Sequence, residues 1–151
     1  METIKKSIEV ERPLSTVYNQ WTQFEQFPRF MKEVKRVTQL DDQRLHWEAE
    51  IGGKNKEWDA RITDQIPDHL IVWQSEGGEY ISGAVEFATV SPSRTRIDLQ
   101  VVYDPQGFVE SAGDALGLVS GKAESDLERF KEFIEDRGQE TGAWRGTIRE
   151  S

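Results

Sequence analysis

The segment GFVESAGDALGLVSGKAESDLERFKEFIEDR, residues 107–137, decides the fold of this chain. Its apolar side chains recur at alternating intervals of three and four residues, which is the spacing of one face of an α-helix. This apolar stripe consists of Val109, Ala112, Leu116, Val119, Ala123, Leu127, Phe130 and Ile134. Gly138 follows, and glycine is typical of the residue just past a helix end. The spacing therefore predicts one long amphipathic helix from Gly107 to about Arg137.

The chain before this helix alternates between apolar and polar residues, which is typical of β-strands with one buried face. Residues 3–11 form the first predicted strand, and six more strands separated by short turns are predicted between residues 34 and 103. Trp47, Trp58 and Trp73 lie in the middle of three of these strands, on their apolar faces. Short connections make the sheet antiparallel with one face in solvent, and the long helix is the natural partner of its apolar face.

Two short helices are predicted between the first strand and the rest of the sheet. Pro13 suits the first turn of a helix, and the apolar residues that follow it recur at helical spacing. A second, aromatic segment surrounds Pro28, where the proline interrupts a regular helix. The predicted fold class is therefore α+β, with an antiparallel sheet of about seven strands packed around the C-terminal helix.

The composition bounds the organisation and the partners of the chain. Its 151 residues suit one domain, which we expect over residues 1–138, followed by a polar, mobile tail over residues 139–151 with Trp144 as its candidate anchor. The net charge of −9 argues against nucleic-acid partners, because phosphate binding needs clustered lysine and arginine. The absence of cysteine excludes disulfides and thiolate metal sites. No stretch approaches the roughly 18–20 apolar residues of a membrane span, so we expect a cytoplasmic protein.

Several segments together carry a family resemblance that covers essentially the whole chain. They are residues 17–31 (VYNQWTQFEQFPRFM), Val34 with Val37, His46–Trp47 with the hairpin to Glu57–Trp58, residues 66–73, residues 83–87, residues 130–135 and the tail residues 142–146 (GAWRG). In this order they resemble the helix-grip fold of the START/Bet v 1-like (SRPBCC) superfamily, and within it the polyketide cyclase/dehydrase branch that also contains the coenzyme-Q-binding proteins.

The resemblance implies a curved sheet that grips the long helix, with a cavity between them for a hydrophobic guest. The candidate ligand-binding residues of this cavity are Phe30, Trp47, Trp58, Trp73, Phe87, Tyr103, Leu116 and Val119. The alternative is that these large side chains form a close-packed core, since protein interiors usually reach the density of organic crystals. Small residues beside the rings, such as Ala49 and Ala60, favour the cavity.

Gly113, Gly117 and Gly121 recur every four residues along one row of the predicted helix. Each glycine costs about 1 kcal/mol relative to alanine in a helix interior. The row therefore indicates an irregular helix start or a close backbone contact, or else a pliable lid, residues 108–119, over the cavity mouth.

Catalytic signals in the sequence are poor. His46 and His69 are the only histidines, and strand parity points His46 outward while His69 follows a turn. No histidine pair has helical spacing and no strained nucleophile turn is present, so neither a metal site, a cofactor nor a catalytic residue is identified. Buried acid–base partners remain open as an alternative.

Three functions follow as hypotheses. The first is binding or transport of a hydrophobic small molecule, such as a lipid, an isoprenoid quinone or a polyketide-like aromatic. The second is an aromatase/cyclase-like dehydratase acting on a polyketide-type substrate, although the predicted inward faces carry few titratable groups. The third is an acidic adaptor that engages an unknown protein partner through Trp144.

Overall fold

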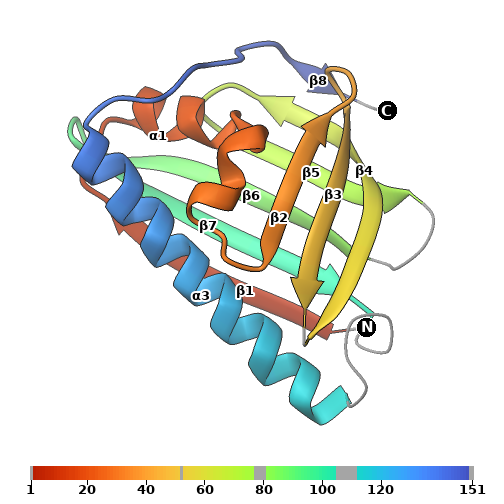
Figure 1. The fold of residues 1–151 in the computed structure, drawn as a ribbon. Coiled ribbons are helices and arrows are strands. Elements are labelled where there is room, and N and C mark those ends of the chain that lie inside the picture. Colours follow the sequence, from red (N-terminus) through yellow and green to blue (C-terminus); the bar gives the residue numbers. More distant parts are fainter. Residues whose placement is uncertain (1, 52, 77–80, 105–111, 150–151) are drawn as a thin grey trace.

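The computed structural model describes residues 2–51, 53–76, 81–104 and 112–149 (Figure 1). Its elements in chain order are β1 (Glu2–Val10), α1 (Leu14–Trp21), the 3₁₀ helix η1 (Phe24–Arg29), β2 (Val34–Gln39), β3 (Arg44–Ile51), β4 (Lys54–Ile66), β5 (Leu70–Glu76), β6 (Ile81–Ser91), β7 (Arg94–Tyr103), α3 (Ala112–Arg137) and β8 (Ile148–Arg149). The predicted order of strand, two short helices, meander and long helix is confirmed.

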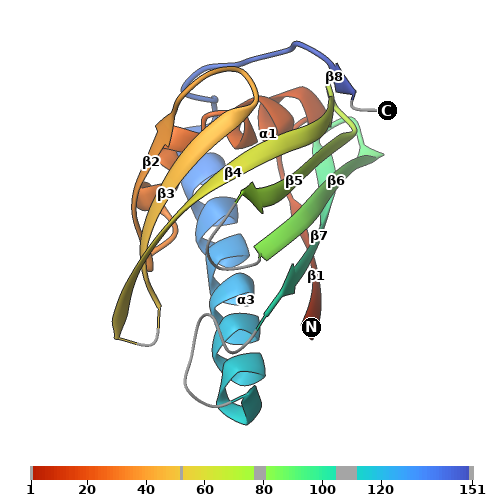
Figure 2. The same cartoon turned by 90° about the vertical axis from the view of Figure 1, so that its right-hand side faces the viewer.

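The strands form one antiparallel sheet in the order β1-β7-β6-β5-β4-β3-β2, with β8 added to β4. The sheet curls around α3, which lies in its hollow (Figures 1 and 2). Register shifts interrupt the pairing between Val34 and Arg36, between Ile62 and Asp64, and between Thr89 and Ser91. Irregularities of this kind bend a strand and increase its twist, so they contribute to the curl. The helix-grip architecture is thereby confirmed.

The inward faces of the strands are the predicted ones. Leu45 and Ala49 on β3 are buried, as are Ala60 and Ile62 on β4. The central tryptophans of these two strands are direct partners across the sheet, since Trp47 pairs with Trp58.

The two short helices close one end of the hollow with aromatic side chains. Trp21 of α1 packs edge-on against Phe27 of η1, with ring centroids 5.6 Å apart, and against Phe130 of α3 at 5.0 Å. Phe30 packs on the same Phe130 ring at 5.2 Å. Pro28 lies inside η1, so the proline is accommodated in a 3₁₀ helix instead of ending it. At this end the interior is filled.

The long helix α3 buries the predicted stripe in the part where its side chains are described. Leu127, Phe130 and Ile134 are each at most 2% exposed. The helix ends at Arg137, and Gly138 follows with φ of 79° while its N–H donates to the carbonyl of Ile134 at 2.9 Å. This is the left-handed stop that the sequence predicted. Residues 107–111, where the helix was expected to begin, lie outside the described residues.

The C-terminal segment, residues 139–149, lies along α1 and ends as β8 on β4 (Figure 1). The Gln20 amide exchanges two hydrogen bonds with Thr141, at 3.1 and 2.8 Å. The N–H of Trp144 donates to Oγ1 of Thr22 at 3.1 Å, and the Trp144 ring packs against the core. Trp144 is thus placed as the anchor, while the mobility expected of the tail stays a prediction.

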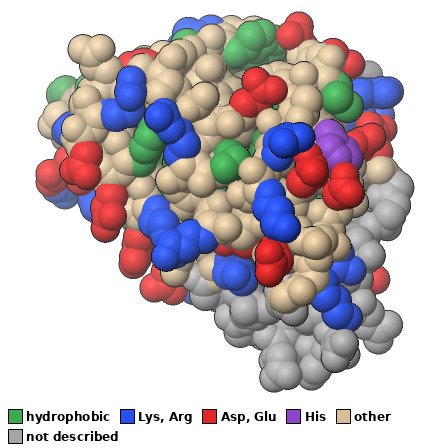
Figure 3. Space-filling view, in the orientation of Figure 1, with side chains coloured by type: hydrophobic (Ala, Val, Ile, Leu, Met, Phe, Trp, Pro, Cys, Tyr) green, Lys and Arg blue, Asp and Glu red, His purple; other side chains and the backbone are tan. Residues whose placement is uncertain are grey.

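The surface carries scattered charge of both signs. On the face shown in Figure 3, basic and acidic side chains are interspersed and hydrophobic ones stand apart from one another. Among the described residues, the exposed large hydrophobics are Leu40 and Val90. None of the described helices is long and apolar enough to cross a membrane.

Candidate functional site

A cavity of about 170 Å³ lies between the concave face of the sheet and α3. Its wall draws on α1, η1, α3 and every strand from β2 to β7. The described residues that line it are Trp21, Phe24, Phe27, Met31, Glu33, Val34, Leu45, Trp47, Ala49, Trp58, Ile62, Ile71, Trp73, Ile81, Leu99, Val101, Lys122, Ala123, Asp126 and Leu127. The interior is therefore filled toward α1 and hollow in the middle of the sheet.

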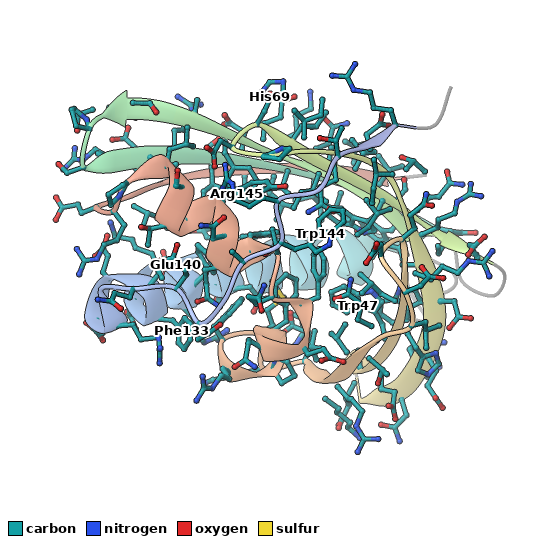
Figure 4. All side chains as sticks on the ribbon, turned by 90° about the horizontal axis from the view of Figure 1, so that it is seen from above. Trp47, His69, Phe133, Glu140, Trp144 and Arg145 are labelled. Atoms are coloured by element: carbon teal, nitrogen blue, oxygen red, sulfur yellow. The ribbon has the colours of Figure 1, made fainter. Side chains whose placement is uncertain are left out.

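Three of the predicted cavity residues, Trp47, Trp58 and Trp73, lie on this wall. The rings of Trp47 and Trp58 are parallel, with centroids 6.1 Å apart. Figure 4 shows Trp47 on the inner side of the curved sheet. The indole Nε1 of Trp47 is buried, and it has no hydrogen-bond partner among the described residues. A buried N–H without an acceptor costs free energy, which makes this atom a candidate contact for a guest.

Three other predicted cavity residues, Phe30, Phe87 and Tyr103, are not among the described residues that line the cavity. Phe87 points inward as its strand parity requires, but α1 covers that end of the sheet, and the ring packs edge-on against Tyr18 at 5.3 Å. Phe30 is enclosed by Phe130 and Phe133, and Tyr103 is buried near the end of β7. The side chains of Leu116 and Val119 lie outside the described residues.

The predicted lid also remains a prediction. Gly113, Gly117 and Gly121 lie within the uninterrupted helix α3, so the row does not break the helix. Residues 108–111 and the side chains of residues 112–121 lie outside the described part of the chain.

Among the described residues of the cavity wall, Glu33, Lys122 and Asp126 have titratable side chains. Asp126 is 7% exposed, and its Oδ1 accepts a hydrogen bond from Nη1 of Arg129 at 3.0 Å. Burial, the hydrogen bond to Glu33 and the charge of Glu33 raise the pKa of Asp126 to about 9, although Arg129 and Lys122 oppose this. The Asp126 carboxyl therefore holds a proton at neutral pH and shares it with Glu33.

The sequence analysis missed this carboxyl pair, although one half of it left a signal. Asp126 lies three residues after Ala123 and four before Phe130, so it occupies a position of the apolar stripe. Its partner could not be found by spacing. Glu33 lies between η1 and β2, and its carbonyl is held by the N–H of Glu50 at 2.7 Å, a contact that only the folded sheet creates.

The two histidines lie where they were predicted. His46 is on the outer face of β3, where Nδ1 is 2.7 Å from Oδ1 of Asp59 and Nε2 is 3.0 Å from Oε1 of Glu57. These two hydrogen bonds raise the pKa of His46. His69 is exposed after the turn at Asp68 (Figure 4).

One histidine and two carboxylates approach each other on this outer face. His46, Glu48 and Glu57 each place one potential ligand atom within 4.8 Å of the others. The sequence did not reveal this grouping, because it arises from the register of β3 on β4.

Comparisons with known proteins agree with this architecture. Residues 10–133 match the family described as polyketide cyclase/dehydrase and lipid transport. An uncharacterized 17.2 kDa protein of Streptomyces lincolnensis is 48% identical over 149 residues, which are 98% of this chain and 99% of the relative.

Solved structures share the fold at low identity. The Zhui aromatase/cyclase of Streptomyces sp. R1128 superposes with a TM-score of 0.76 at 15% identity, covering 95% of this chain and 99% of that one. A START superfamily protein of Mycobacterium smegmatis superposes with a TM-score of 0.71 at 17% identity, covering 89% and 95%. The chain therefore belongs to the polyketide cyclase/dehydrase and lipid transport family, with the fold of the START/Bet v 1-like superfamily.

Proposed function

We propose that this protein binds a hydrophobic small molecule in the cavity between the sheet and α3. The observation that carries the proposal is the wall of that cavity, which is built mainly from tryptophan, phenylalanine and aliphatic side chains. Burying a guest there removes apolar surface from water on both sides, at about 25 cal/mol per Å². A few polar groups on such a wall fix the orientation of the guest.

The volume narrows the choice of guest. About 170 Å³ is close to the engineered cavity of about 150 Å³ that binds benzene, and it is below the roughly 300 Å³ at which pockets for drug-sized ligands begin. Of the three predicted guest classes, a compact aromatic ring system suits this space best.

The first test is native mass spectrometry of the purified protein, followed by organic extraction of any bound molecule. Ala123→Leu adds bulk from α3 into the cavity and should abolish retention of the guest. Ala88→Leu makes the same change on the exposed outer face of β6 and should retain it. If the protein is isolated without a guest, binding of one-ring aromatics is compared between these two variants by thermal shift. Equal shifts in both would reject the proposal.

A second candidate function is that of an aromatase/cyclase-like dehydratase. The observation that favours it is the protonated Asp126 on the cavity wall, because a carboxyl with a raised pKa can act as a general acid. Turnover of a polyketide-type substrate that is lost in Asp126→Asn, while binding persists, would support it. The adaptor hypothesis is not favoured, since the Trp144 ring packs against the core.

A further inference from the structure

Resting on the proposed function, we infer that the cavity selects a neutral, phenol-type aromatic guest, whose hydroxyl group is recognised by the Glu33–Asp126 carboxyl pair and by the indole N–H of Trp47. Both anchoring points belong to the wall of the same cavity. They are independent observations, since one lies on α3 and the η1–β2 connection and the other on β3.

The carboxyl pair supplies the acceptor. Oδ1 of Asp126 accepts a hydrogen bond from Arg129, and the Asp126 carboxyl group is also hydrogen-bonded to Glu33. The Glu33 carboxylate has two oxygens, so it retains accepting capacity after it accepts the hydrogen bond from protonated Asp126. A hydroxyl group donating to this carboxylate would form a charge-assisted hydrogen bond, which is roughly twice as strong as a neutral one.

The indole of Trp47 supplies the donor. Indole Nε1–H can only donate, and in the part of the chain that is described this atom is buried without an acceptor. An oxygen atom of the guest would satisfy it. A guest hydroxyl group can donate to the carboxylate and accept from the indole N–H. A hydrocarbon can do neither, and an ether can only accept from the indole.

The charges around the pair bear on anionic guests. Glu33 faces Asp126 from the η1–β2 connection, and Lys122 and Arg129 face it from α3. Arg129 is held by Asp126, while Lys122 lies on the cavity wall. A guest carboxylate would meet Lys122 but also the negative charge that the pair retains. We expect the second effect to prevail, because Asp126 is 7% exposed and Glu33 is half-buried, so water screens the charge of the pair only in part.

The test uses four one-ring molecules of similar size: p-cresol, p-xylene, 4-methylanisole and p-toluate. Their affinities are measured at pH 7 by calorimetry and by the shift of the Trp47 indole N–H signal in NMR, assigned by its absence in Trp47→Phe. We expect p-cresol to bind about 3- to 10-fold more tightly than p-xylene, the effect of one or two net hydrogen bonds. 4-Methylanisole should fall between them, and p-toluate should bind most weakly.

Two variants locate the preference. Glu33→Leu removes the accepting carboxylate and should abolish the preference for p-cresol while p-xylene still binds, which shows that the cavity is intact. Asp126→Asn keeps a donor toward Glu33 and an acceptor for Arg129, so it should retain most of the preference. Trp47→Phe should reduce the preference for p-cresol and 4-methylanisole together.

The outcomes separate the two proposals. If none of the four molecules binds, the proposed function is overturned and this inference with it. If p-cresol and p-xylene bind equally, or p-toluate binds most tightly, the selection of a phenol-type guest is overturned while the binding function stands.

Discussion

Trp73 lies directly across the sheet from Gly83, and its ring occupies the space that any side chain at position 83 would need. A Cβ atom there would lie 2.6 Å from Cη2 of Trp73 and 2.8 Å from the carbonyl oxygen of Gln100. The glycine on β6 thus allows a tryptophan on β5 to lie flat on the sheet and form part of the cavity wall.

Gly83→Ala should therefore destabilise the protein and displace the Trp73 ring. We expect a loss of about 1–3 kcal/mol in the free energy of unfolding, the usual cost of added bulk in a packed site. Urea unfolding measures it. Ala88→Val adds more bulk on the outer face of the same strand and should change stability by less than about 0.5 kcal/mol. Equal effects of the two substitutions would contradict the expectation.

The pH dependence of stability should report on Asp126. Its pKa is raised from 3.8 to about 9, so the folded protein holds a proton that the unfolded chain has released. Folding takes up this proton, and the free energy of unfolding should fall as the pH rises from about 4 toward 9, by at most about 1.4 kcal/mol per pH unit.

Asp126→Asn removes this linkage. Its stability relative to the wild type should increase steadily between pH 5 and pH 8 in urea unfolding experiments. Glu128→Gln, an exposed substitution on the same helix, is the control and should leave the slope unchanged. The explanation fails if the wild type and Asp126→Asn have parallel profiles.

His46 should titrate above its ordinary pKa because the hydrogen bonds to Asp59 and Glu57 favour its charged form. Its contribution to stability is then present below the pKa of the unfolded chain and is lost as the pH rises through the raised value. NMR titration of the ring protons measures this pKa directly. Asp59→Asn should lower it, and no shift between the two proteins would refute the assignment of the cause.

Removal of residues 139–151 should lower the melting temperature. The truncation deletes β8, the ring of Trp144 and the side chain of Arg145, which pairs with Asp68 at 2.7 Å and donates to Asn19 at 2.6 Å. Arg145→Ala alone should cost little, about 1 kcal/mol or less, since the side chain is 42% exposed. An unchanged melting temperature after truncation would instead support a mobile tail outside the domain.

Most of the fold follows from periodicity, because a single buried face imposes a period on each element. Trp47, Trp58 and Trp73 could be placed on the cavity side by alternation alone. The same rule put Phe87 inward correctly but could not tell that α1 covers that end of the sheet. Parity assigns a side chain to a face, and only the packing of other elements decides whether that face is filled or hollow.

The polar end of the site was harder to predict. Asp126 is visible as an acid within an apolar stripe, but an isolated acid at such a position can also turn to solvent. The raised pKa of Asp126 depends in part on Glu33, which lies 93 residues earlier in the chain and is brought into contact with Asp126 by the fold. The indole N–H of Trp47, which has no acceptor among the described residues, likewise has no signature in the sequence, because only the folded surroundings decide whether an acceptor is near.

The short strand β8 has a consequence for self-association. The register of β3 on β4 ends at Arg61, and the N–H of Ile62 still donates to the carbonyl of Gln43. β4 continues to Ile66, so its last residues would present a free edge on that side. β8 covers this edge by pairing with Asp64 and Gln65. Unpaired strand edges invite addition of a strand from another molecule, which is a route to aggregation. By covering this edge, Ile148 and Arg149 leave less of β4 open to pairing with a strand of a second molecule.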